Sequence, residues 1–372
     1  MQNTPHRFWQ TLRVELREGW VGLHLVLAVA IVSRYLHALI SISTLNKAIS
    51  EILIAVLLGL YLRNSIGLGE RAKAGVKFSI HRILRFGIIL LGLRLSLQDV
   101  IGTGITALVL VTICILVALL LAYFAGRIFH VPPRLAALIG VGTAICGNTA
   151  IVATAPVLGA DDEEVSFAVA TITFFGLLAV LTYPTLGRLI GLTDHAFGMW
   201  AGTAVNDTSQ VVAVGTIFSE AALDVAIIVK LTRNTLMAPL IVLVGLFYAR
   251  GLNRKMDSQA AEASRLNWRK LIPGFAIGFL AMSLLRSAGV ALGFLPQNVA
   301  HPGDLQFAAD VLIALDEISK FAILMALAGV GLNTDLKSLR RMGVKPLIVG
   351  TCVAVVLALV SLGLILYTPL GI

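Results

Sequence analysis

Apolar runs of about twenty residues recur along almost the whole chain, and they limit its fold more than any other feature. A helix needs roughly 20 apolar residues to cross the hydrocarbon core of a bilayer. Such runs cannot be barrel strands, and an isolated strand could not satisfy its backbone in lipid. The sequence therefore predicts an all-α membrane protein. The eleven expected spans are approximately 20–40, 46–63, 79–97, 103–130, 134–159, 165–191, 197–219, 222–250, 270–292, 308–333 and 345–368.

The charge content agrees with this prediction. Only 13% of the 372 residues are charged, whereas a soluble domain carries about 25%. Residues 1–19 form a charged cytoplasmic segment without a cleavage signature, and residues 20–368 form one polytopic transmembrane domain.

Lysine and arginine gather in alternate loops, while an intervening loop reads Asp161-Asp162-Glu163-Glu164. The positive-inside rule then places the amino terminus in the cytoplasm and the carboxyl terminus in the periplasm, across a bacterial inner membrane. This pattern accounts for the net charge of +9, so no nucleic-acid partner is predicted. The cationic positions are Arg7, Arg13, Arg17, Arg63, Arg71, Lys73, Lys77, Arg82, Arg127, Arg134, Arg188, Arg250, Arg254, Lys255, Arg265, Arg269, Lys270, Lys337, Arg340, Arg341 and Lys345.

The chain has no sequence signature of an enzyme or a metalloprotein. Cys114, Cys146 and Cys352 lie inside apolar runs and lack metal-ligand or disulfide spacing. Nucleotide-binding loops, zinc-protease motifs and nucleophile elbows are also absent. We therefore expect no enzyme activity, no metal and no cofactor, and a secondary transporter is the favoured class over a membrane scaffold.

One apolar segment, Gly142 to Ala155, carries glycines, threonines and an asparagine. Glycine weakens a helix by ~1 kcal/mol relative to alanine, and Asn148 needs a partner in hydrocarbon. These residues predict a helix that unwinds midway, so that its freed backbone groups line a hydrated cavity. The alternative is close helix packing through small residues.

Two internal echoes indicate duplication. The string GTAICGNTAIVA from Gly142 aligns without a gap with GTAVNDTSQVVA from Gly202, at an offset of 60. A second echo links Leu84–Asp99 with Ser319–Asp335. On the eleven-span topology the second pair runs antiparallel, as an inverted repeat requires, whereas the first pair runs parallel.

Lys230 and Arg233 are the residues from which the charge of the substrate is predicted. They lie three residues apart on one helical face of an apolar segment, and charges at that depth face a cavity or a partner. Two cations favour an anionic substrate such as a carboxylate or sulfonate. The alternatives are a structural bridge with Asp207 and extension toward the membrane surface. Lys320 is a third cation or pairs with Asp316 and Glu317.

Asp207, next to Asn206, supports a different hypothesis. A lone carboxylate in an apolar helix can carry a proton through a transport cycle. Thr171 and Thr173 could complete a sodium shell, which would make the chain a cation/proton antiporter.

The segments Ala144–Ala160, Trp200–Val211 and Ile318–Leu336 together give the chain a family resemblance. It resembles the sulfate exporter family of YeiH-type bacterial inner-membrane transporters over roughly residues 20 to 368. That resemblance implies an inverted-repeat fold similar to bile-acid symporters and cation/proton antiporters, with a core domain moving against a panel domain.

The resulting prediction is a transporter that moves a small anion, such as sulfate or a sulfonate, by alternating access. Sodium or proton coupling through Asp207, Thr171, Thr173 and Lys320 is part of the prediction. The expected partners are the anionic solute and membrane lipid, and the sequence is compatible with a homodimer. The predicted substrate ligands are Thr143, Asn148, Thr149, Asn206, Thr208, Ser209, Gln210, Lys230 and Arg233.

Overall fold

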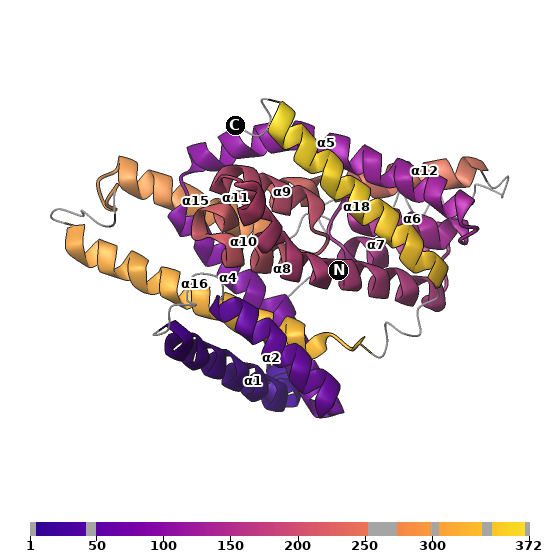
Figure 1. The fold of residues 1–372 in the computed structure, drawn as a ribbon. Coiled ribbons are helices and arrows are strands. Elements are labelled where there is room, and N and C mark those ends of the chain that lie inside the picture. The colour runs from indigo at the N-terminus through magenta and orange to yellow at the C-terminus, as the bar shows by residue number, and fades with distance from the viewer. Residues whose placement is uncertain are drawn as a thin grey trace. The chain divides into compact units, whose positions relative to one another are not determined.

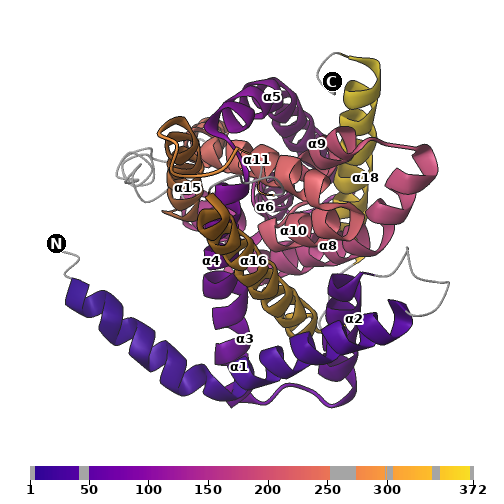
Figure 2. The same ribbon diagram turned by 90° about the vertical axis from the view of Figure 1, so that its left-hand side faces the viewer.

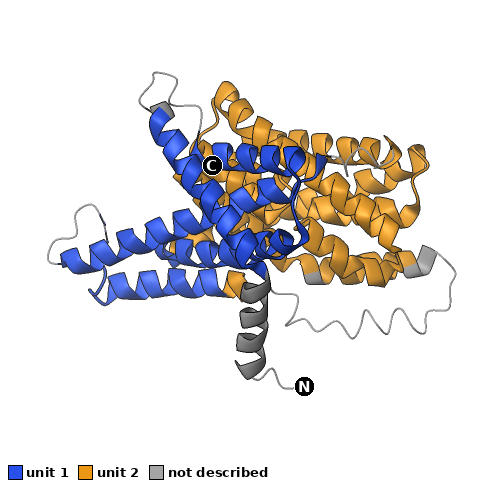
Figure 3. Cartoon of the chain, turned by 90° about the horizontal axis from the view of Figure 1, so that it is seen from below, with its two compact units in different colours: residues 1–97, 278–337 blue, residues 98–277, 338–372 orange. Residues whose placement is uncertain are grey.

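The computed structural model describes residues 5–41, 50–251, 274–297, 299, 305–336 and 344–368. The described residues form helices and no strands, which confirms the all-α fold class. The chain divides into two compact units, Met1–Leu97 with Gly278–Lys337 (unit 1) and Gln98–Ile277 with Ser338–Ile372 (unit 2) (Figure 3). The predicted cations from Arg254 to Lys270 and from Lys337 to Arg341 lie outside the described residues.

Unit 1 is held together by helices that approach at backbone distance (Figure 2). A Cβ on Gly75 would lie 1.9 Å from the carbonyl oxygen of Gly19, and one on Gly331 would lie 2.3 Å from that of Val56. Only glycine permits such contacts. The elements of unit 1 are α1 (Pro5–Ser41), α2 (Glu51–Ser65), α3 (Glu70–Phe78), the π-helix η1 (Ser79–Ile83), α4 (Leu84–Leu91), the 3₁₀-helix η2 (Gly92–Arg94), most of α15 (Gly274–Ala291) and α16 (Gln306–Asn333).

Unit 2 is built around two long helices and four short ones (Figure 1). The long α5 and α8 have 32 and 29 residues. The four short helices, α6, α7, α9 and α10, have 11 or 12 residues each. In chain order the elements are α5 (Leu97–Ile128), α6 (Pro133–Ala144), α7 (Asn148–Leu158), α8 (Asp162–Ile190), α9 (Asp194–Ala204), α10 (Thr208–Phe218), α11 (Glu220–Thr235), α12 (Met237–Gly251) and α18 (Val344–Tyr367).

Local chemistry fixes both ends of α8. Asp161 accepts from the Glu164 amide at 2.8 Å while the Glu164 side chain accepts from the Asp161 amide, which is a capping box. Gly191 ends the helix in the left-handed region at φ 74°. These ends define a helix of about 43 Å, at 1.5 Å per residue.

Both echoing segments are interrupted, and the two breaks have different causes. Between α6 and α7, Gly147 adopts φ 66° and ψ −122°, a conformation that favours glycine. Between α9 and α10, Val205 is extended and Asp207 caps the next helix. Small-residue packing occurs beside the second break, where Gly198 and Gly202 bring α9 against the backbone of α11.

The number of crossing helices differs from the prediction. Five described helices are long and apolar enough to cross a membrane, and α11 with Pro239–Tyr248 adds a sixth that bends by 46°. The expected spans 134–159 and 197–219 are not among them. α2 has 15 residues, and α16 carries three charges near its middle, so eleven crossings are not confirmed.

Candidate binding site at two helical hairpins

Helices α6 and α7 fold back on each other to form hairpin 1, Pro133–Leu158. Arg134 at its start donates to the carbonyl of Gly159 just beyond its end at 2.7 Å. The same residues in one straight helix would separate these ends by roughly 37 Å. The segment 134–159 therefore returns to its starting side instead of crossing, which corrects the sequence-based topology.

Helices α9 and α10 form hairpin 2, Asp194–Phe218, in the same way. Ser219 donates to the carboxylate of Asp194 at 2.6 Å, and the rings of Phe197 and Phe218 stack at 3.8 Å. The segment 197–219 is thus also a hairpin. Its two helices begin and end 60 residues after those of hairpin 1, except that α9 begins one residue later.

The two hairpins enter from opposite ends of α8 and meet near its middle. Hairpin 1 ends just before Asp162, and hairpin 2 begins just after Ile190. Their tips nevertheless touch neighbouring turns, because Gly147 faces Ile172 and Gln210 donates to the carbonyl of Thr173 at 3.4 Å. Because they approach from opposite ends, the 142 and 202 segments run antiparallel, and the expectation of a parallel pair was wrong.

Lys230 from α11 joins the two tips. Its Nζ donates to the carbonyl oxygens of Ile145 at 2.7 Å and Val205 at 3.1 Å, and also to that of Asn206. These carbonyls belong to the carboxyl ends of α6 and α9, which carry partial negative charge and lack helical partners. The buried cation therefore supplies donors that the two broken helices need.

Arg233, one turn further along α11, repeats this arrangement. Its Nε donates to the carbonyl of Ala144, and Nη1 donates to those of Thr203 at 2.9 Å and Val205 at 3.0 Å, with a longer contact to Gly202. Its Nη2 is buried without a hydrogen-bond partner. Arg233 is 1% exposed and Lys230 is fully buried, and neither forms an ion pair with Asp207.

The amino ends of α7 and α10 differ. Asp207 caps α10, accepting from the amide of Ser209 at 2.9 Å and from its hydroxyl at 2.8 Å, while Gln210 accepts from the Asp207 amide at 3.2 Å. The cap of α7 is Gly147, which has no side chain. The first amides of α7, at Asn148 and Thr149, therefore face the tip region without a cap.

The other predicted substrate ligands fall into two groups. Asn148 and Thr208 are half-buried and Thr149 is exposed, so these three are accessible at the tips. Thr143, Asn206, Ser209 and Gln210 are buried. The side-chain oxygens of Asn148 and Asn206 have no hydrogen-bond partner.

The other predicted coupling residues belong to α8 and α16. Thr171 bonds to the carbonyl of Phe167 within α8, and Thr173 contributes its own carbonyl to Gln210. Lys320 lies in unit 1 and pairs with Asp316 at 2.9 Å and with Glu317 at 3.5 Å, which agrees with the paired alternative.

The sequence reasoning missed Asn234. It is 2% exposed, and its side-chain oxygen is buried without a partner, directly after Arg233. An asparagine beside a charged residue in an apolar segment was the available signal.

Comparison with known proteins adds a family but no substrate. Residues 21–350 match the model of the family described as conserved hypothetical protein 698. A UPF0324 membrane protein of Bacillus cereus is 35% identical over 366 residues, covering 97% of this chain and 99% of the relative. One from Streptococcus pyogenes is 36% identical over 347 residues, covering 92% of this chain and 95% of the relative. None of these names states a sulfate substrate.

Proposed function

The chain belongs to the UPF0324 family of membrane proteins, and we propose that it is a secondary transporter of a small anion. The observation that carries the proposal is the charge at the two hairpin tips. Two buried cations, Lys230 and Arg233, lie at the tips, and one carboxylate, Asp207, caps α10 there, so these three residues carry one positive charge in excess. A buried excess charge in an apolar surrounding favours a ligand of opposite sign.

The proposed anion site is the uncapped amino end of α7. Its free amides and positive helix end suit an anion, and Asn148 and Thr149 add side-chain donors. In this proposal the two cations hold the tips together, because carbonyl oxygens occupy most of their donors. They also supply the positive electrostatic potential that attracts the anion. Sulfate, sulfonates and carboxylates all fit this chemistry.

Alternating access is proposed from the hairpins themselves. They meet at a shared centre from opposite ends of α8, and this arrangement supports the proposal of an inverted repeat. Each hairpin could separate the centre from the compartment on its own side. Movement of a core domain against a panel domain remains a prediction that follows from the sequence resemblance.

A second candidate function rests on Asp207. Its carboxylate is half-buried, caps α10 and accepts from the amide and the hydroxyl of Ser209. A half-buried carboxylate between two helix tips is a candidate site for a proton or sodium. This observation supports the alternative of a cation/proton antiporter, or of coupling within the anion transporter.

The deciding experiment is calorimetric titration of the purified protein with sulfate, methanesulfonate, acetate and sodium, each separately. We expect one of the anions to bind and Asn148→Leu to weaken it at least tenfold, because a hydrogen bond to a charged group contributes about 1.5–3 kcal/mol. Thr112→Val is the matched control, since Thr112 bonds only to its own helix. Sodium binding that Asp207→Asn abolishes, without binding of any anion, would favour the antiporter.

The hairpins also change the proposed topology. The start of hairpin 1, its end and the end of α12 lie together, since Tyr248 donates to the Pro133 carbonyl. Arg127 and Arg134 lie at this end of unit 2, so the positive-inside rule makes it cytoplasmic in the bacterial inner membrane. The loop at Asp162 then moves to the cytoplasmic side, opposite to the sequence-based prediction.

Cysteine labelling tests this topology. A cysteine at Asp162 should be protected in intact cells from an impermeant thiol reagent, whereas one at Thr193 should react, with the unsubstituted chain as the blank. Reaction at position 162 together with protection at 193 would reverse the orientation. Equal reaction at both positions would show that α8 does not cross.

A further inference from the structure

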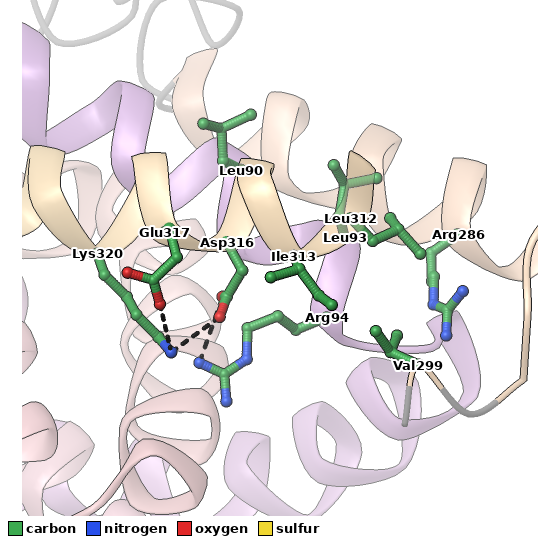
Figure 4. A pocket seen from close by; sticks show the side chains of 10 residues that line it. All are labelled: Leu90, Leu93, Arg94, Arg286, Val299, Leu312, Ile313, Asp316, Glu317 and Lys320. Carbon is green, nitrogen blue, oxygen red and sulfur yellow. Dashed lines mark ion pairs between the residues drawn. The ribbon is translucent and has the colours of Figure 1, made fainter. Parts of the chain in front are cut away.

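Unit 1 contains a cavity of about 350 Å³ that is separate from the hairpin tips. It lies among α4, η2, α15, α16 and the segment after α15 (Figure 4). Its charged lining consists of Arg94, Arg286, Lys320, Asp316 and Glu317. Three cations therefore accompany two carboxylates.

The two carboxylates already have cationic partners. Lys320 pairs with Asp316 at 2.9 Å and with Glu317 at 3.5 Å, and Arg94 lies 3.6 Å from Asp316. Arg34 on α1 also pairs with Glu317 at 3.4 Å. The excess positive charge of the cavity thus falls on the remaining cation, Arg286.

Arg286 is 8% exposed and incompletely bonded. Its Nη2 donates to the carbonyl of Gln297 at 3.2 Å, while Nη1 is buried without a hydrogen-bond partner. Among the described residues no carboxylate lies within ion-pair distance of it. Figure 4 shows the guanidinium groups of Arg286 and Arg94 extending to the same side of α16. A buried guanidinium with an unused donor is costly unless an acceptor occupies the cavity.

The remaining walls are apolar, and the flanking helices expose large apolar side chains. Three leucines, Ile313 and Val299 complete the lining. On α15, a candidate membrane span, Leu284 and Leu285 are 53% and 56% exposed, and on α16 Phe307 is 82% exposed. A ligand that reaches this cavity from the bilayer would combine an anionic group with an apolar chain.

We propose that the cavity binds the phosphate head group of an anionic membrane lipid, with Arg286 as the phosphate ligand. The acyl chains would lie along the exposed apolar faces of α15 and α16. A phosphodiester offers several acceptor oxygens for Nη1, and arginine suits phosphate geometry. This lipid site is independent of the transport proposed for unit 2.

Native mass spectrometry of the purified protein, titrated with dioleoylphosphatidylglycerol or dioleoylphosphatidylcholine, tests the proposal. We expect the anionic lipid to bind the unsubstituted protein more tightly, and Arg286→Gln to weaken that binding roughly tenfold or more. Arg127→Gln, at an exposed arginine of unit 2, should leave it unchanged. Equal affinity of Arg286→Gln and the unsubstituted protein for the anionic lipid would overturn the proposal.

Two further measurements test the lipid site independently of Arg286→Gln. Ile313 lies at a half-exposed position in the cavity wall, so Ile313→Trp should obstruct the cavity without adding volume to the core. We expect this variant to bind the anionic lipid more weakly. It tests the proposal even if Arg286→Gln does not fold. Inorganic phosphate should fail to displace the lipid at millimolar concentration. Full displacement by phosphate would mean a site for a small soluble anion, and the lipid assignment would be wrong.

Discussion

Hairpin 1 and hairpin 2 differ by one residue in length, are offset by 60 residues and both contact α8, but their tips are completed differently. Position 147 is a glycine where position 207 is an aspartate, and position 149 is exposed where position 209 is buried. Hairpin 2 thus satisfies its own amino-terminal amides, whereas hairpin 1 leaves them open. A nearly symmetric pair of backbones produces an asymmetric site through a few side chains.

The largest expected effect tests what the hairpins have in common. Lys230→Met removes its donor from three carbonyls at both tips, and those of Ile145 and Asn206 lose it without the arginine donor that Val205 keeps. Each orphaned carbonyl costs about 1 kcal/mol or more. We expect the free energy of unfolding to fall by about 2 kcal/mol, measured by thermal or denaturant unfolding in detergent.

The control for this variant is Lys320→Met, which removes a half-exposed cation from unit 1. Its expected cost is about 1 kcal/mol or less, since partly exposed ion pairs contribute little. If Lys230→Met proves as stable as this control and loses only anion binding, Lys230 is a direct substrate ligand, as the sequence first suggested.

The next effect distinguishes the two breaks. Gly147→Ala places a Cβ at φ 66°, within 3.3 Å of the Asp207 carboxylate. A strained backbone of this kind costs about 1–3 kcal/mol, so the unfolding midpoint should fall. The matched Gly102→Ala lies in α5 with open space around it and should stabilise the protein slightly, because alanine is the better helix former. Equal effects would show that hairpin 1 does not need its glycine.

The smallest effect separates the charge of Asp207 from its capping role. Asparagine caps a helix about as well as aspartate, so Asp207→Asn should change stability by less than about 0.5 kcal/mol, whereas Asp207→Ala should cost ~1 kcal/mol. The asparagine variant should still alter the pH or sodium dependence of transport in liposomes. If the pH and sodium dependence of transport is unchanged in this variant, the role of Asp207 is structural only.

The sequence predicted the helical class and the break within Gly142–Ala155, but neither the second break nor the geometry of the two. The glycines and polar residues near 142 indicate a helix that stops, and α6 ends at Ala144; the echoing segment stops in the same way at Ala204. Whether the chain then continues or turns back depends on contacts between distant residues, such as Arg134 with Gly159. Hydropathy is nearly the same in the two cases, so the segments were counted as spans.

The hydrogen-bond acceptors of Lys230 and Arg233 could not be predicted from the sequence either. Their spacing identified a shared face, and their burial was expected. The acceptors are backbone carbonyls, which carry no residue-specific signal, whereas the protein partner predicted from the sequence was a side chain, that of Asp207. Asn148 and Thr149 were predicted because polar residues in an apolar run are rare, and both lie in the first turn of α7 at the tip of hairpin 1.

The lengths of α5 and α8 have a consequence for the surrounding bilayer. At 32 and 29 residues they measure about 48 and 43 Å, whereas the hydrocarbon core is about 30 Å thick. Helices this long fit the bilayer by tilting or by thickening the lipid around them. Reconstitution into lipids of shorter and longer acyl chains should therefore shift the thermal stability of the protein, with the optimum in the thicker membranes.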